Sequence, residues 1–275
     1  MFIHLENRAL LKVSGSDAET FLQGQFSNDI KKLNTSSVQL NAYCQHQGKI
    51  LALIWVMRHE TSFFLSFSLD LLEVIKSRLQ MFVIMSDVNI DDITSSYHQI
   101  GIIDEKHQET YVINDKLSLI IDDKNNSNKF KMDSLDIWNM ACIDSCLPEI
   151  YLKTAEKLVP QMLNLDIDEI GVNFSKGCYP GQEVVARLHY LGSAKRRLFT
   201  FKSEAELNVG DALYCASSKT AKVRGDRYKG SGIILNKVKF NSLFHCLATL
   251  DVDLIDNEIT LNNEHGPILK RMHNE

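Results

Sequence analysis

The stretch KGCYPGQEVVAR, residues 176–187, sets a cysteine between two glycine-containing turns just ahead of a predicted helix. The glycines can take backbone angles that other residues avoid, and the proline stiffens the chain between them. The apolar spacing that follows is helical as far as Gly192. The stretch therefore predicts a rigid loop that carries Cys178 to the start of a helix.

The place of Cys178 in this loop favours its thiolate. A helix N-terminus carries partial positive charge, and Lys176 lies two residues before the cysteine. One interpretation is a reactive or ligand-contacting thiol, and the other is a buried cysteine in a tight turn. The stretch alone does not decide between them, because a cysteine without an assigned base does not establish nucleophilic catalysis.

The composition of the chain limits what kind of protein it is. Its 275 residues are enough for about two domains, and its net charge of −5 argues against a general binder of phosphate backbones. No apolar run reaches the roughly 18–20 residues needed to cross a bilayer, and the N-terminal residues do not resemble a secretory signal. We expect a soluble, cytoplasmic protein with no membrane partner.

Six cysteines are scattered along the chain, which argues against a disulfide framework. Cys142 and Cys146 are four residues apart, so on a helix they could form a pair of metal ligands. A structural zinc site needs about four ligands, and the sequence has no second pair of this kind. We therefore expect free thiols and no metal site.

The N-terminal part of the chain mixes strand and helix patterns. Residues 8–13 predict a strand, and Ser16 and Glu19 have the spacing of a capping box at the start of a helix. The apolar runs at 49–57 and 62–67 predict a β-hairpin.

Further along, apolar residues after Leu71 repeat at helical spacing, and MFVIM, residues 81–85, predicts a strand. Another helix should begin after Asp133 or Ser134. From about residue 195 short β-rich runs alternate with turns, which is typical of a small β-barrel. Together these patterns predict an α+β fold.

KGCYPGQEVVAR resembles the signature of the YgfZ family, folate-binding relatives of the glycine cleavage T-protein. The resemblance covers most of the chain, although the last 75 or so residues match only in β character. Four other segments are similar to segments of the family: GSDAETFLQGQFSNDI (15–30), AYCQHQGKIL (42–51), VPQMLNLD (159–166) and AKRRL (194–198).

The resemblance implies an aminomethyltransferase-like architecture. Residues 1–195 would form a folate-binding body of two intertwined subdomains, roughly 1–45 with 133–195 and 46–132. Residues 196–275 would form a C-terminal β-barrel.

The resemblance also implies a tetrahydrofolate in a central cavity and a role in assembling or repairing iron–sulfur enzymes, including enzymes that modify tRNA. Cys178 and Lys176 are the candidate catalytic residues. A tryptophan offers a flat stacking face, and a carboxylate can pair with neighbouring N–H donors of a pterin. The expected folate contacts are Trp138, Asp144, Tyr179, Gln182, Glu183 and Arg187.

The chain departs from the family at three points. Cys146 stands where the family more often has a glycine, before an x-Pro pair. Arg8 aligns with a tryptophan that contacts folate in some members. The aspartate that T-protein uses in its chemistry has no clear counterpart, which favours a non-enzymatic folate-dependent factor.

Two other functions remain open on the sequence. A tetrahydrofolate-dependent aminomethyl transferase would need a general acid or base, for which Asp29 and His46 are candidates. A tRNA-binding module would use the basic run Lys195, Arg196 and Arg197. Since the chain is acidic overall, we expect no direct contact with tRNA. We expect a monomer whose partners are iron–sulfur enzymes or cluster-assembly proteins.

Overall fold

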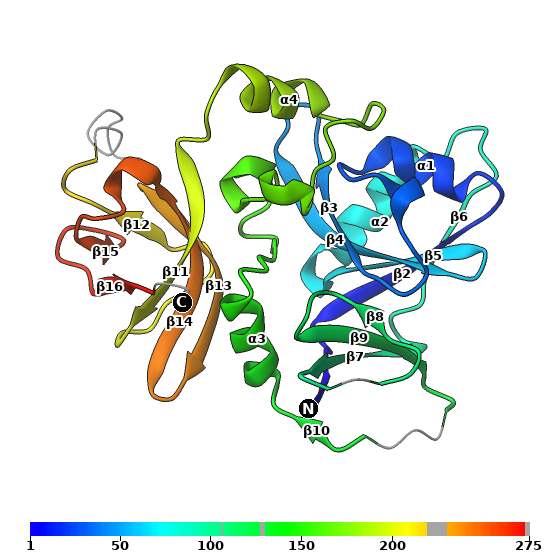
Figure 1. Ribbon diagram of the computed structural model, residues 1–275, viewed down its shortest axis with the longest axis horizontal. Helices are drawn as coiled ribbons and strands as arrows, with labels where there is room; N and C mark the ends of the chain where they lie inside the picture. Colours follow the sequence, from blue (N-terminus) through cyan, green and yellow to red (C-terminus); the bar gives the residue numbers. More distant parts are fainter. Residues whose placement is uncertain (106, 127–129, 219–229, 273–275) are drawn as a thin grey trace.

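The computed structural model describes residues 1–105, 107–126, 130–218 and 230–272. A body of two β-sheets and a C-terminal β-barrel lie on either side of helix α3 (Leu135–Asp144), as Figure 1 shows. The α+β fold class predicted from the sequence is confirmed.

The first sheet contains the strand and the hairpin that the N-terminal sequence predicts. The hairpin strands β4 and β5 pair antiparallel, with Trp55 opposite Ser66. Residues 50–57 of β4 are buried along both faces, which explains their unbroken apolar run. The order of strands is β3 (Gln39–Cys44), β4 (Ile50–His59), β5 (Ser62–Ser68), β2 (Arg8–Ser14) and β6 (Asn89–Asp92).

The second sheet combines the N-terminus with residues more than ninety positions later. Its central strand β7 pairs antiparallel with β1 on one side and with β9 on the other. The order of strands is β10 (Met132–Asp133), β1 (Phe2–His4), β7 (Tyr97–Ile103), β9 (Leu117–Asp123) and β8 (Tyr111–Val112). Residues 127–129, which follow β9, lie outside the described part of the chain.

Helix α1 (Ala18–Gln25) forms where the sequence predicts it, but the predicted capping box is wrong. The N-cap residue is Asp17, and the Ser16 hydroxyl donates to Asp87 Oδ2 instead, at 2.8 Å. Glu19 forms an ion pair with Arg58 at 2.7 Å. Tertiary partners therefore take both side chains away from the local motif.

Helix α2 (Leu72–Met81) is confirmed, whereas the strand predicted at 81–85 is wrong. Met81 ends the helix, and residues 82–86 form an irregular turn in which Ile84 is 71% exposed and Met85 has φ 59°. The edge of β2 is paired instead with β6, so the apolar segment has no strand partner there.

The helix expected after residue 133 is α3, and Ser134 is its N-cap. The Ser134 hydroxyl accepts a hydrogen bond from the backbone N–H of Asp136 at 3.2 Å. Helix α4 (Gln182–Leu191) follows the signature stretch and ends at Gly192, as predicted. The short 3-10 helices are η1 (Ile30–Lys32), η2 (Leu69–Leu71), η3 (Pro160–Leu163), η4 (Ile167–Glu169) and η5 (Val252–Leu254).

The C-terminal strands close into the expected barrel. Its interior has its own apolar core, while Val238 and Leu247 on the outer side join the core of the body across α3. The order of strands is β11 (Arg196–Ser203), β14 (Leu243–Asp251), β13 (Gly232–Phe240), β12 (Ala212–Tyr214), β15 (Ile259–Leu261) and β16 (Ile268–Arg271). In the described residues, no helix is long and apolar enough to span a membrane.

The proposed boundary between subdomains, at residues 45 and 46, falls between β3 and β4. These strands are neighbours in one sheet, with Leu40 opposite Trp55. The sheet therefore draws on both sides of the boundary, and the division of the body into subdomains stays a prediction.

Candidate functional site

The signature loop is fastened to the end of helix α1 by Lys176. This side chain is 8% exposed, and its ammonium donates hydrogen bonds to the carbonyl oxygens of Gln23 (2.7 Å), Phe26 and Asn28 (3.0 Å). A lysine at a helix C-terminus satisfies carbonyls that lack partners within the helix. Burial lowers the pKa of Lys176 to about 8, and the nearby Asp29 carboxylate acts in the opposite direction.

In the structure the Lys176 ammonium holds the loop in place, and its catalytic role stays a prediction. All three protons of an ammonium have an acceptor among carbonyls at and just after the end of α1, which come from the GSDAETFLQGQFSNDI segment. The ammonium also lies 5.2 Å from the centre of the Tyr179 ring. One side chain thus joins two of the segments that resemble the YgfZ family.

A second contact fastens the same loop to the turn between β3 and β4. Gly181 has φ 82°, and a Cβ atom at this position would lie 2.5 Å from the carbonyl oxygen of Gln45 and 2.7 Å from Cα of Gly48. Gly48 has φ 75° and lies under the side chain of Val184. These two glycines allow the backbones to touch, so the AYCQHQGKIL segment supports the signature from the other side.

Two further segments are tied to the same region. The Gln161 side-chain amide donates to the carbonyl oxygen of Val185, on α4, at 2.7 Å. Arg197 binds both oxygens of the Asp166 carboxylate, at 2.5 and 3.0 Å. The VPQMLNLD and AKRRL segments are thereby connected to each other and to the helix that follows the signature.

Cys178 is exposed on this supported loop. The other thiols lie deeper: Cys146 is half-buried, and Cys44, Cys142, Cys215 and Cys246 are buried. The loop ends three residues later at Gly181, which is the N-cap residue of α4. The structure therefore places the thiol at the surface, as the first interpretation of the stretch requires.

The other signature residues divide into buried and exposed ones. Tyr179 is buried, and burial raises the pKa of its hydroxyl. The Gln182 side-chain amide reaches back to the carbonyl oxygens of Lys176 and Gly177, both at 3.5 Å. Glu183 and Arg187 lie on the exposed side of α4.

Trp138 lies elsewhere, on α3, and is only 3% exposed. A Cβ atom on Gly101 of β7 would lie 2.5 Å from its indole ring, so the strand backbone packs directly on one side of the ring. Trp55 meets it edge to face with ring centres 6.3 Å apart. The expected stacking face is thus covered in this structure, because a glycine lets the strand close over it.

Asp144 is exposed at the end of α3, six residues after Trp138. Partial burial of the carboxyl raises its pKa, and His245 of the barrel and Lys116 of the body act in the opposite direction. The structure therefore separates the candidate residues into two groups, one around the signature loop and one on α3, as the positions of α4 and α3 in Figure 1 show.

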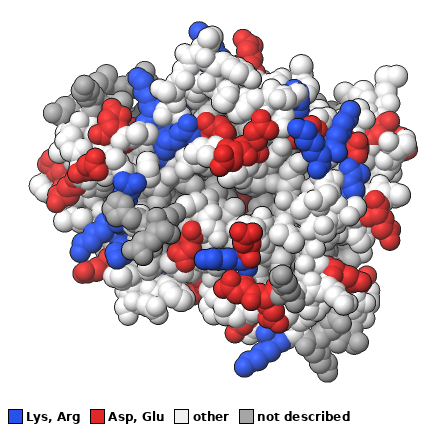
Figure 2. Space-filling view, viewed as in Figure 1, with Lys and Arg blue, Asp and Glu red and all other residues white. Residues whose placement is uncertain are grey.

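Most of the residues considered for the transferase and tRNA-binding functions are engaged in contacts within the protein. Asp29 accepts hydrogen bonds from the Gln23 amide at 3.0 Å and from the N–H of Lys31 at 3.2 Å. His46 is exposed in the turn after β3. Of the basic run, Arg196 binds Asp251 at 2.8 Å and Arg197 binds Asp166. On the face in Figure 2, basic and acidic side chains are interspersed, which does not resemble a continuous phosphate-binding strip.

Known proteins similar to this chain span most of its length. An uncharacterized protein of Haemophilus influenzae is 33% identical over 220 residues, which cover 77% of this chain and 78% of that protein. The tRNA-modifying protein YgfZ of Colwellia psychrerythraea is 29% identical over 235 residues (74% and 72%), and that of Aliivibrio fischeri strain MJ11 is 25% identical over 281 residues (93% and 85%). The chain is a distant homologue of the YgfZ proteins. No family model matches it.

The fold of this YgfZ homologue matches that of the glycine cleavage T-protein. The crystal structure of the glycine cleavage system aminomethyltransferase T from Bartonella henselae superposes with a TM-score of 0.71, over 99% of this chain and 84% of that chain. At 12% sequence identity, the likeness shows the fold alone. The expected aminomethyltransferase-like architecture with a C-terminal barrel is confirmed.

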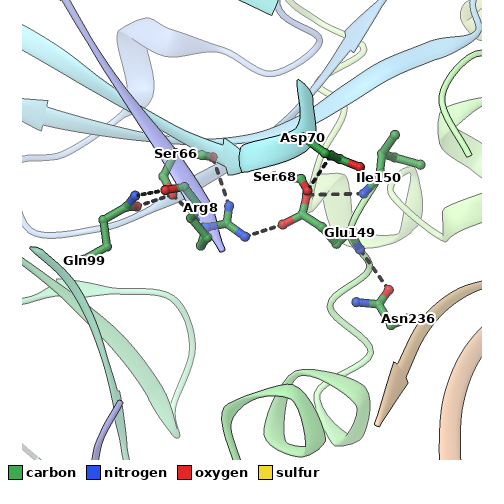
Figure 3. A network of polar contacts seen from close by, with 8 residues as sticks. All are labelled: Arg8, Ser66, Ser68, Asp70, Gln99, Glu149, Ile150 and Asn236. Atoms are coloured by element: carbon green, nitrogen blue, oxygen red, sulfur yellow. Dashed lines mark hydrogen bonds and ion pairs between the residues drawn. The ribbon is translucent and has the colours of Figure 1, made fainter. Parts of the chain in front are cut away.

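The chain also contains a buried polar network that its sequence did not predict (Figure 3). Arg8 forms a buried ion pair with Glu149, and its guanidinium lies 3.8 Å from the centre of the Trp55 ring. Arg8 also donates to the hydroxyl (2.8 Å) and to the carbonyl oxygen (3.0 Å) of Ser66. The backbone N–H of Glu149 donates to Asn236 on β13 at 3.0 Å, so the network connects the body to the barrel.

The only sequence signal for this network was the arginine itself. The acidic partner of Arg8, Glu149, is 141 positions away in the sequence. No pattern of local spacing could have joined them. Arg8 packs on the face of the Trp55 ring, and Trp55 in turn meets Trp138 edge to face.

Proposed function

We propose that this chain is a folate-binding factor that supports iron–sulfur enzymes, including enzymes that modify tRNA, and that this support depends on Cys178. Its named relatives in the YgfZ family are described as tRNA-modifying proteins. The observation that carries the proposal is the exposed thiol of Cys178 on a loop fastened from two sides.

Rigid support and exposure together point to a use for the thiol outside the protein. A cysteine that only fills space is usually buried, as four of the other five are here. Lys176 and Gly181 fix the backbone before and after Cys178, so the sulfur is presented in one place. This arrangement suits contact with a partner protein or with a group that the partner carries.

The folate part of the proposal rests on Asp144. Its carboxylate is accessible and interacts electrostatically with His245 and Lys116, and a carboxylate can accept hydrogen bonds from the neighbouring N–H donors of a pterin. Trp138, on the same helix, packs against Gly101 and Trp55 and so anchors α3 to the body. A bound tetrahydrofolate would supply a carrier for one-carbon groups.

The remaining candidate folate contacts differ in whether their side chains are free to meet a ligand. Glu183 and Arg187 are exposed on α4 and are free to meet a ligand or a partner surface. Tyr179 and Gln182 are engaged within the loop, so they would act by shaping it. We place the pterin at Asp144 and the partner contact at Cys178.

Calorimetry with purified protein tests the folate part. We expect tetrahydrofolate to bind the wild type, and Asp144→Asn to weaken binding by the equivalent of about 1–3 kcal/mol, because one charge-assisted hydrogen bond is lost. Asp136→Asn, a substitution at the start of the same helix, is the matched control. Unchanged affinity in Asp144→Asn would contradict the placement of the pterin at Asp144.

A turnover assay distinguishes a non-enzymatic folate-binding factor from a one-carbon transferase. If the chain is a non-enzymatic factor, it binds tetrahydrofolate without consuming a methylene donor. Steady consumption of the donor would instead identify a tetrahydrofolate-dependent one-carbon transferase. In cells, loss of the chain should lower the activity of an iron–sulfur enzyme while leaving the amount of that enzyme unchanged.

A further inference from the structure

A groove on the outside of the barrel brings two lysines together. It runs between the end of β11 and the start of β16, and its lining includes Lys202, Glu204, Leu243, Pro267, Ile268 and Lys270. Apolar and polar side chains are mixed along it, as is typical of a small-molecule site. Nothing in the folate proposal above uses this groove.

The two lysines lie directly opposite each other on paired strands. Lys202 of β11 is in register with Lys270 of β16, and on its other side Lys202 is in register with His245 of β14. Opposed residues of an antiparallel pair point to the same face, and like charges in such positions destabilise the sheet. Three basic side chains therefore form one row across the barrel surface.

Two other basic residues of the barrel have acidic partners. Lys237 lies 3.7 Å from Glu206, and Arg196 lies 2.8 Å from Asp251. Among the residues that the structure describes, neither Lys202 nor Lys270 forms an ion pair. An anion between them would remove their mutual repulsion.

The row leads from the groove to the candidate folate residue. His245 interacts with Asp144 at the end of α3, and Lys202 is close enough to lower the pKa of His245 further, in addition to the effect of burial. Strands lie about 4.8 Å apart, so the distance from His245 to Lys270 is roughly 10 Å. A ligand held at Asp144 could thus extend an anionic end into the groove.

We propose that the groove binds the glutamate tail of tetrahydrofolate through Lys202 and Lys270. Folates carry one or more γ-linked glutamates, whose carboxylates are anions separated by short apolar chains. The lysines pair with the carboxylates, and Leu243, Pro267 and Ile268 contact the methylene groups. Glu204, exposed at the same groove, disfavours an anion beside it and so directs the carboxylates toward the lysine pair. This inference rests on the folate function proposed above.

Binding of tetrahydrofolate with one glutamate and with three glutamates tests this directly. We expect the wild type to bind the triglutamate about three- to tenfold more tightly, the size that one or two partly exposed ion pairs supply. The difference should shrink in high salt. In the double variant Lys202→Gln, Lys270→Gln, the two ligands should bind with equal affinity.

Lys239→Gln is the matched control, because Lys239 is an exposed lysine of the same barrel that does not line the groove. It should keep the preference for the triglutamate. Equal binding of the two ligands by the wild type overturns the groove assignment and leaves the folate proposal intact. Absence of binding of either ligand overturns both. If the double variant loses affinity for tRNA while the wild type shows no triglutamate preference, the groove is a phosphate site and this inference is wrong.

Discussion

Lys176 shows how a single residue can join two distant motifs. Its ammonium lies among the last carbonyls of α1, more than 140 positions away in the sequence. Because this site is buried, the charged form is disfavoured relative to the unfolded chain, and the pKa falls from 10.5 to about 8.

This shift predicts a pH dependence of stability. Between about pH 8 and 10.5 the unfolded chain binds the Lys176 proton more tightly than the folded protein does. The contribution of Lys176 to the free energy of unfolding therefore rises with pH in this window, by at most about 1.4 kcal/mol per pH unit. Urea unfolding at several pH values should show a steeper rise for the wild type than for Lys176→Met. Equal slopes for the two proteins would contradict the shift.

Cys178 should be the first of the six thiols to react with an alkylating reagent. It is exposed, whereas Cys146 is half-buried and the other four are buried. Native protein treated with limiting iodoacetamide, followed by peptide mass spectrometry, should show label on Cys178 before any other site. Labelling in urea is the control, since unfolding should make the six rates similar. Faster labelling of Cys146 in the native protein would count against the exposed loop.

At the residue scale, some features follow from the local sequence and others only from the completed fold. The exposure of Cys178 follows from a turn-rich stretch, and the structure agrees with it. The burial of Trp138 could not be predicted, because it depends on Gly101 in a strand 37 positions earlier. The pairing of Arg8 with Glu149 likewise depends on the completed fold.

At the scale of elements, the signature is a loop followed by α4, and both pack on the turn between β3 and β4. Gly181 and Gly48 bring the two backbones into contact, which explains why the stretch needs a glycine before its helix. The predictions for α1, α2 and α4 succeeded where one apolar face decides the structure. They failed where a distant partner decides it, as at residues 81–85, where β6 has taken the edge of β2.

Gly181→Ala should therefore destabilise the protein more than Gly177→Ala. Gly181 has φ 82° and its new Cβ atom would meet the Gln45 carbonyl oxygen, whereas a Cβ atom on Gly177 meets nothing within 4 Å. We expect a loss of at least about 1–3 kcal/mol for Gly181→Ala, the usual size of such backbone strain, and little change for Gly177→Ala. Urea denaturation of both variants measures this. Equal stability of the two would show that the loop does not pack on the turn.

At the scale of the whole molecule, the buried Arg8 network holds the barrel and the body together. The Glu149 carboxylate forms an ion pair with Arg8 of the body. The backbone N–H of Glu149 donates a hydrogen bond to Asn236 of the barrel. The β texture beyond residue 195 was enough to predict a barrel. Its placement against α3 was not predictable, since it depends on polar and apolar contacts between parts far apart in the chain.

Arg8→Met should cost about 3–5 kcal/mol of stability, because it leaves the Glu149 carboxylate buried without its partner. The double variant Arg8→Met, Glu149→Leu should regain most of this loss, since no unpaired charge remains. Thermal and urea unfolding of the single and double variants form the cycle. Additive losses in the double variant would show that the two side chains do not depend on each other.

The central claim, that support of iron–sulfur enzymes depends on Cys178, is tested most directly in tRNA. The measurement is the level of a modified nucleoside made by an iron–sulfur enzyme, in a strain lacking the gene for this chain. Wild type and Gly177→Ala, the neutral neighbour in the same loop, should restore the nucleoside. Cys178→Ala, present at the same protein level, should leave it near the level of the deletion strain. Full restoration by Cys178→Ala would contradict the account.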